Sequence, residues 1–143
     1  MKKLITLMLV GAALAVPAAT AAPMKGKPPG GTKPCHGKAK VMVVLKGTLA
    51  NDPVAGDISF QLTVLHTNRW GRVYKLATQP LTVNVADTTR YVKNDQPATL
   101  DSLAMNDQVV VKAKASRCDV RDADPASPPA LTAKMVVDQS AGS

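Results

Sequence analysis

The chain has 143 residues, with 18 Lys or Arg, ten acidic residues that are all Asp, two His and two Cys. A formal net charge of +8 and a hydrophobic content of 45% are compatible with one small domain that has a modest core. The absence of Glu and the scarcity of His leave few groups for acid–base chemistry, so the composition argues against an enzyme.

The first residues have the three parts of a secretory signal peptide. Lys2 and Lys3 precede an apolar run from Leu4 to Val16, and small residues follow it. This run is about 13 residues long, short of the ~20 that span a bilayer. We expect cleavage after Ala21, removal of residues 1–21, and a protein that is secreted or kept in the periplasm or cell envelope. A retained anchor is the alternative interpretation.

Residues 22–39 form a segment rich in Pro, Gly and Lys. Such a composition buries too little apolar surface to offset the entropy of ordering, which predicts a flexible basic arm. Residues 41–143 carry eleven Lys or Arg against ten Asp, so the predicted domain (40–139), with its short tail (140–143), is nearly neutral. The arm is typical of a solubilising or surface-associating segment rather than of a nucleic-acid-binding fold.

Alternation of apolar and polar residues after the arm predicts five half-buried strands. They cover residues 40–49, 58–64, 81–85, 108–115 and 131–137. Turn-forming residues predict a wide hairpin loop between the first two strands. Residues 66–80 are expected to form a ribbon around a turn at 68–71, and residues 117–129 a polar loop.

Residues 98–107 predict a short helical turn and a tight corner before the fourth strand. Thr99 is expected to cap this turn with its hydroxyl, while Leu100 and Leu103 share a face that plugs the barrel. Asn106 tolerates the left-handed backbone that such a corner requires. This order of elements predicts an all-β fold: a five-stranded, OB-like Greek-key barrel with a short helical turn between strands 3 and 4.

Three segments of the predicted domain carry a recognisable pattern: ADTTR (86–90), LDSLAMNDQVVV (100–111) and LTAKMV (131–136). They resemble a bacterial domain-of-unknown-function family of small exported OB-like modules, with one extra threonine in the first segment. Members of the family read ADTR, then LxxLxxGDxVxV, then LxAxxV, and Asn106 here stands in place of the Gly. The resemblance covers about residues 41–138, but the long segment between strands 2 and 3 and the cysteine-bearing loop depart from the pattern. It implies a barrel in the cell envelope and implies no activity.

The two cysteines are expected to form a disulfide, as is usual in an exported chain. The first and fourth strands of an OB-like barrel are antiparallel neighbours, so Cys35, before one, should meet Cys118, after the other. Such a bond stabilises by about 3–5 kcal/mol in the chain-entropy model. The alternatives are a redox or metal-binding thiol pair, or a copper site with Met24 and His36, whose spacing fits no known ligand arrangement.

The segment from His66 to Tyr74 gathers cations and aromatic side chains. Cations beside aromatic rings stack on bases or sugars, so we take Arg69, Trp70, Arg72 and Tyr74 as candidate ligand-binding residues. The alternative is a structural ribbon in which the two rings cover the flank of the barrel.

No cofactor, metal site or catalytic residue is predicted. The aspartates of residues 119–124 lack the order of an EF-hand loop and its final Glu. The leading functional hypothesis is an exported, non-catalytic OB-like module that binds or scaffolds an unidentified ligand. The alternative is an oligonucleotide- or polysaccharide-binding barrel that uses the Arg/Trp/Tyr segment. Either way, the expected partner is an anionic polymer or the envelope surface.

Overall fold

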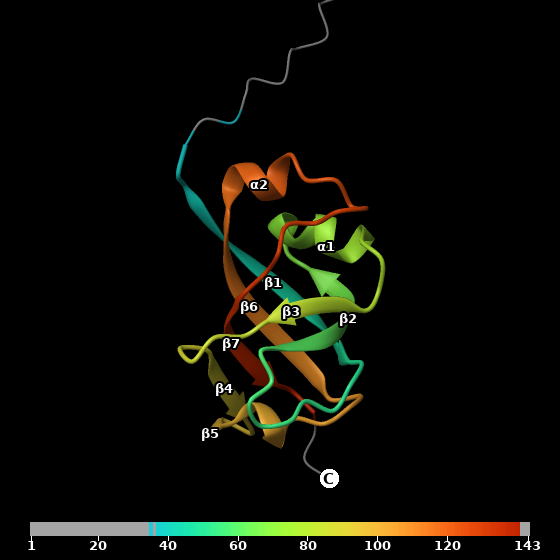
Figure 1. The fold of residues 1–143 in the computed structure, drawn as a ribbon, viewed down its shortest axis with the longest axis vertical. Helices are drawn as coiled ribbons and strands as arrows, with labels where there is room; N and C mark the ends of the chain where they lie inside the picture. Colours follow the sequence, from blue (N-terminus) through green and yellow to red (C-terminus); the bar gives the residue numbers. More distant parts are fainter. Residues whose placement is uncertain (1–34, 36, 141–143) are drawn as a thin grey trace, which may run out of the picture. The chain divides into compact units, whose positions relative to one another are not determined.

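The computed structural model describes Cys35 and residues 37–140. The expected signal peptide (1–21), residues 22–34 of the expected arm and residues 141–143 of the expected tail lie outside the described residues. The described chain is mostly strand, and its sheet curls into a barrel-like shape (Figure 1). The predicted all-β class is therefore confirmed.

The sheet has seven strands in the order β3-β2-β1-β6-β7-β4-β5. Their bounds are β1 Lys40–Leu49, β2 Ser59–Thr67, β3 Leu81–Asn84, β4 Arg90–Lys93, β5 Gln96–Ala98, β6 Gln108–Ser116 and β7 Ala133–Asp138. The five predicted strands correspond to β1, β2, β3, β6 and β7.

The predicted number of five strands was wrong, because the spacer after β3 forms the hairpin of β4 and β5. Asn94 and Asp95 make its two-residue turn, with φ of 51° and 60°. Asn and Asp tolerate positive φ better than most residues, and tight hairpin turns require it.

The alternating residues of β1 form the centre of the core. Val43, Leu45 and Leu49 are buried, and β1 pairs antiparallel with both β2 and β6. The β1–β2 register shifts at Gly47, where a Cβ atom would collide with the carbonyl of Thr63. A glycine is therefore required where these two strands approach closely.

Hydrogen bonds also link the edge strand β3 to the segment that leads into β7. Asn84 forms a parallel bridge with Thr132, and its N–H donates to the carbonyl of Leu131 at 2.9 Å. The buried Thr89 hydroxyl donates to the carbonyl of Ala133 at 2.8 Å, and β4 then runs parallel to β7. The curled sheet is thus held across its opening.

Three short helical segments lie together at one end of the sheet (Figure 1): η1 Arg69–Gly71, α1 Arg72–Leu76 and α2 Arg117–Arg121. The expected ribbon at 72–77 and the expected loop at 117–121 were therefore wrong. Val73, Tyr74 and Val120 face the core from these helices. Helices of about one turn contain too few residues for a 3.6-residue pattern to be visible in the sequence.

The short helical turn before β6 is confirmed as η2 (Leu100–Ser102), at the opposite end of the sheet. Leu100 and Leu103 are buried, and Asn106 has a φ of 71°, as expected. The predicted hydroxyl cap of Thr99 was wrong: its carbonyl instead accepts from the Ser102 hydroxyl at 2.6 Å.

A polar cluster joins β4 to the corner before β6 and to the end of β7. The ammonium of Lys93 lies 3.0 Å from the fully buried Asp138 carboxylate and 3.2 Å from that of Asp107. Burial alone would raise the pKa of Asp138, but hydrogen bonds from Ser140 and the nearby Lys93 outweigh it and hold this pKa below its usual value. Asp138 is therefore ionised and stabilising at neutral pH.

The predicted disulfide between Cys35 and Cys118 is confirmed. Lys40 pairs with Ser116 in the β1–β6 ladder, which brings the two cysteines to the same rim. Their sulfurs are bonded at 2.04 Å, and their Cα atoms lie 5.3 Å apart. The bond fixes α2 to the residue that precedes β1 and leaves neither cysteine as a free thiol.

Candidate functional site

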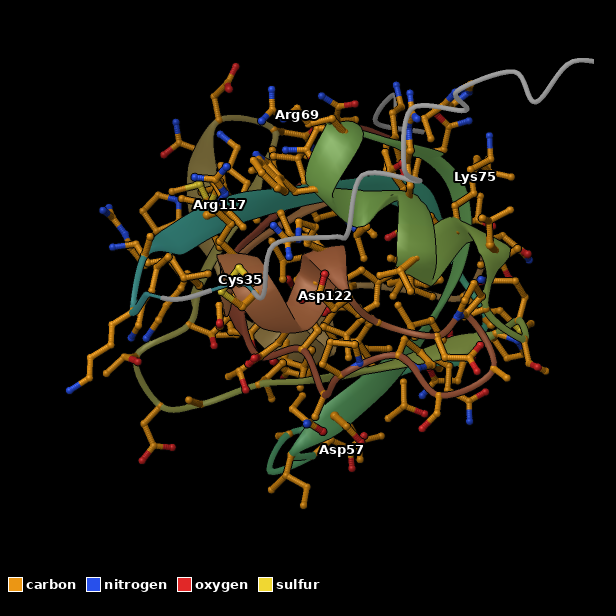
Figure 2. The ribbon with its side chains drawn as sticks, turned by 90° about the horizontal axis from the view of Figure 1, so that it is seen from above. Cys35, Asp57, Arg69, Lys75, Arg117 and Asp122 are labelled. Atoms are coloured by element: carbon orange, nitrogen blue, oxygen red, sulfur yellow. A yellow bond between two sulfur atoms is a disulfide. The ribbon has the colours of Figure 1, made fainter. Side chains whose placement is uncertain are left out.

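A pocket of about 300 Å³ lies at the helical end of the fold, between the η1–α1 segment and α2. We call it the helical-end pocket, and Figure 2 looks onto this end of the molecule. Its described lining consists of arginines and apolar side chains: Arg69, Trp70, Arg72, Val73, Leu76, Val120, Arg121, Ala123 and Pro125.

The first wall comes from one face of η1 and α1. Arg69, Arg72 and Leu76 are spaced three and four residues apart, so a helical backbone places them on the same side. Val73 continues this face into the core, whereas Leu76 is 72% exposed. The wall therefore presents two guanidinium groups beside an exposed aliphatic side chain.

Asn68 starts this helical segment and ties it to the sheet. Its Oδ1 accepts from the N–H of Gly71 at 3.1 Å and of Val44 at 3.3 Å. Its Nδ2 donates to the carbonyl of Met42 at 2.8 Å. One side chain thus caps η1 and satisfies two polar groups of β1, which fixes where the wall begins.

Gly71 allows η1 to lie close against the sheet. A Cβ atom at this position would come within 2.8 Å of the Thr67 Cβ and 2.9 Å of the Leu45 Cδ2. Any larger residue would push η1 outward, and Arg69 and Trp70 would move with it.

The second wall comes from α2 and the residues after it. Ser116 caps α2 by accepting from the N–H of Asp119 at 3.4 Å, and Val120 anchors the helix in the core. The disulfide holds the same helix through Cys118. Arg121, at the rim of the pocket, forms an ion pair with Asp122 at 2.7 Å.

Trp70 is half-buried, and arginines cover its ring. The guanidinium of Arg69 lies 4.2 Å from the ring centroid and that of Arg117 lies 5.7 Å from it. This cation–π contact orients Arg69 at the rim of the pocket. Because Arg69 stacks on the ring, a base or sugar must displace it before it can stack on the same face of Trp70.

The η1–α1 segment carries the net positive charge of the helical end, because residues 117–124 contain two Arg against three Asp. Residues 69–76 contain three cations and no acid, whereas the rest of 41–143 contains eight Lys or Arg against ten Asp. Figure 2 shows Arg69 and Lys75 on the η1–α1 side and Arg117 near α2. No carboxylate in the described part of the chain forms an ion pair with Arg69 or Arg72.

Three of the four candidate binding residues line the pocket, and Tyr74 does not. Its side chain is fully buried, and its hydroxyl has no hydrogen-bond partner within the described residues. Burial, and then the nearby Asp119 carboxylate, raise the pKa of Tyr74 to about 12. The structure therefore places Tyr74 in the core.

Sequence reasoning missed the second wall because residues 117–129 were taken as a loop. The spacing of Ser116 and Asp119 is that of a helix N-terminus and could have indicated α2. Among the described residues, no group of three or more His, Cys, Asp or Glu side chains is placed to hold a metal ion. Met24 and His36 of the copper alternative lie outside the described residues.

No protein-family model, curated protein or solved structure matches this chain. Within residues 35 and 37–140, no helix has the length and apolar character needed to cross a membrane.

Proposed function

We propose that the protein is an exported, non-catalytic binding module, and that the helical-end pocket binds a ligand through an anionic group. One observation carries this proposal. Arg69 and Arg72, which form no ion pair within the described residues, line a pocket in which Trp70 orients one of them. Guanidinium groups bind carboxylates and phosphates through two parallel hydrogen bonds.

We also propose that the fold is an OB-like barrel with an added β4–β5 hairpin. Two features support this assignment. Strand β1 pairs with both β2 and β6. Strand β3 contacts the segment before β7 through the parallel bridge of Asn84 and Thr132. These pairings support a barrel of this type built from β1, β2, β3, β6 and β7.

Export is supported by the disulfide, because such bonds persist in oxidising compartments. The disulfide agrees with the predicted signal peptide, and both support a location outside the cytoplasm. A binding role, rather than catalysis, is supported by the described pocket lining, which contains arginines and apolar residues but no carboxylate, imidazole, hydroxyl or thiol.

An oligonucleotide or an acidic polysaccharide is the second candidate ligand. The arginines and Trp70 at the open rim favour it. The burial of Tyr74 removes one of the two stacking rings on which this hypothesis depended.

Fluorescence of Trp70, the chain's single Trp, tests the proposed function. We expect a saturable change with anionic ligands at low salt, weakened by added salt, because ion pairing contributes to the affinity. Single-stranded DNA, polygalacturonate and short alkyl phosphates are the probes. Arg72→Gln is expected to weaken binding at least fivefold, whereas Arg90→Gln, an exposed residue on β4, leaves it unchanged. A fluorescence that no anion alters would contradict the proposal.

A further inference from the structure

We propose that the ligand of the helical-end pocket is a single-chain amphiphilic anion: a phosphate or carboxylate attached to a short aliphatic chain. This inference rests on the proposed function and specifies the ligand class. The pocket combines two kinds of surface that an inorganic ion or a uniformly polar polymer would not use together. These are a cationic rim and an aliphatic floor.

The rim is suited to the head group. Arg69 and Arg72 lie on one helical face, and neither forms an ion pair with a carboxylate in the described chain. Because Arg69 already stacks on Trp70, little side-chain entropy remains to be lost when it binds an anion. The head group therefore meets two guanidinium groups, one of which is already oriented.

The floor is suited to an aliphatic chain rather than to a ring. Val73 and Val120 are buried at its base, and Leu76, which is 72% exposed, extends this aliphatic surface to the open edge of the first wall. Val73, Val120 and Pro125 continue the apolar surface across to the second wall. The one aromatic ring is covered by Arg69, so stacking of a base or sugar is disfavoured, whereas methylene groups need only an aliphatic surface.

The size of the pocket favours a single chain. A volume of about 300 Å³ lies at the small end of ligand-binding pockets. Among the described residues that line the pocket, Leu76 is the one large apolar side chain that is strongly exposed. A short chain with one head group fills such a site, and a lipid surface does not.

A series of alkyl phosphates from methyl to hexyl tests this inference, with Trp70 fluorescence as the readout. These chains are short enough to stay monomeric. In the wild type, each added methylene is expected to tighten binding about two- to fourfold until the floor is covered. Inorganic phosphate, which lacks the chain, and hexanol, which lacks the anion, are both expected to bind more than tenfold more weakly than hexyl phosphate.

Two variants separate the contributions of head group and chain. Arg72→Gln should weaken binding of every phosphate by a similar factor and leave the dependence on chain length intact. Leu76→Ser should flatten that dependence and leave inorganic phosphate unchanged. Both side chains are exposed, so neither change is expected to impair folding. Arg90→Gln is the matched control and should alter neither quantity.

The outcomes distinguish this inference from the proposed function. An affinity that does not depend on chain length would overturn the proposed amphiphilic ligand and leave the anion site standing. The same conclusion would follow if DNA or polygalacturonate bound through Arg72 more tightly than hexyl phosphate. Binding only to vesicles that contain phosphatidylglycerol would also overturn it. Failure of every anion to bind would overturn both.

Discussion

Replacing Cys35 and Cys118 together with Ser removes a cross-link between residues 83 positions apart in the sequence. In the chain-entropy model, closing a loop of this length destabilises the unfolded state by about 4–5 kcal/mol at 25 °C. The native state of the variant keeps its other restraints at this rim. The β1–β6 ladder remains paired up to Lys40 and Ser116, and Val120 remains buried. We therefore expect most of the loss to arise in the unfolded state.

Urea denaturation followed by circular dichroism measures this effect. The free energy of unfolding of the double variant is expected to lie about 3–5 kcal/mol below that of the oxidised wild type. Wild-type protein kept reduced during the experiment is the control and should match the double variant. A difference smaller than about 1 kcal/mol would refute the reasoning, because the cross-link would then restrict the unfolded chain very little.

Three further predictions follow from individual residues. Burial raises the pKa of Tyr74 to about 12, so its hydroxyl should ionise only near that pH in an ultraviolet absorbance titration. Its contribution to stability is complete below about pH 10 and is lost as the pH rises towards 12. Ionisation near pH 10 would contradict its burial. Asp138→Asn should lower the free energy of unfolding by about 1–3 kcal/mol at pH 7, measured in urea. Because the pKa of Asp138 is lowered, this difference should begin to shrink as the pH falls below about 4 and be lost once the pH lies below the folded-state pKa, and a difference that does not change with pH would count against ion pairing with Lys93. Asn106→Ala should cost about 1 kcal/mol in thermal denaturation whereas Asn106→Gly should cost little, and equal losses would contradict a left-handed requirement at this corner.

Much of the sheet could be predicted because alternation directly reports a half-buried strand. Residues 40–49 alternate over ten positions, and their burial follows the pattern. The disulfide followed from topology, since the first and fourth predicted strands had to be neighbours. The hairpin of β4 and β5 was not predicted, because its strands have only four and three residues and its turn is Asn94-Asp95 rather than Asn-Gly.

The candidate site was predictable only in part. The clustering of Arg69, Trp70 and Arg72 identified one wall of the pocket, but residue type alone did not reveal that Tyr74 faces the core. The inward position of Tyr74 depends on the helical backbone of α1. The extended ribbon that we expected there would have pointed these side chains in other directions. The second wall depends on contacts between segments about 50 residues apart in the sequence, Arg69 to Arg121, which local patterns do not encode.

The indole N–H resonance of Trp70 provides the most direct measurement of whether the helical-end pocket binds anions. The chain has one Trp, so a proton–nitrogen correlation spectrum contains one such signal to follow. On titration with hexyl phosphate, the signal should move saturably in the wild type and in Arg90→Gln, and much less in Arg72→Gln. A signal that stays fixed in the wild type, or that moves equally in Arg72→Gln, would contradict the account.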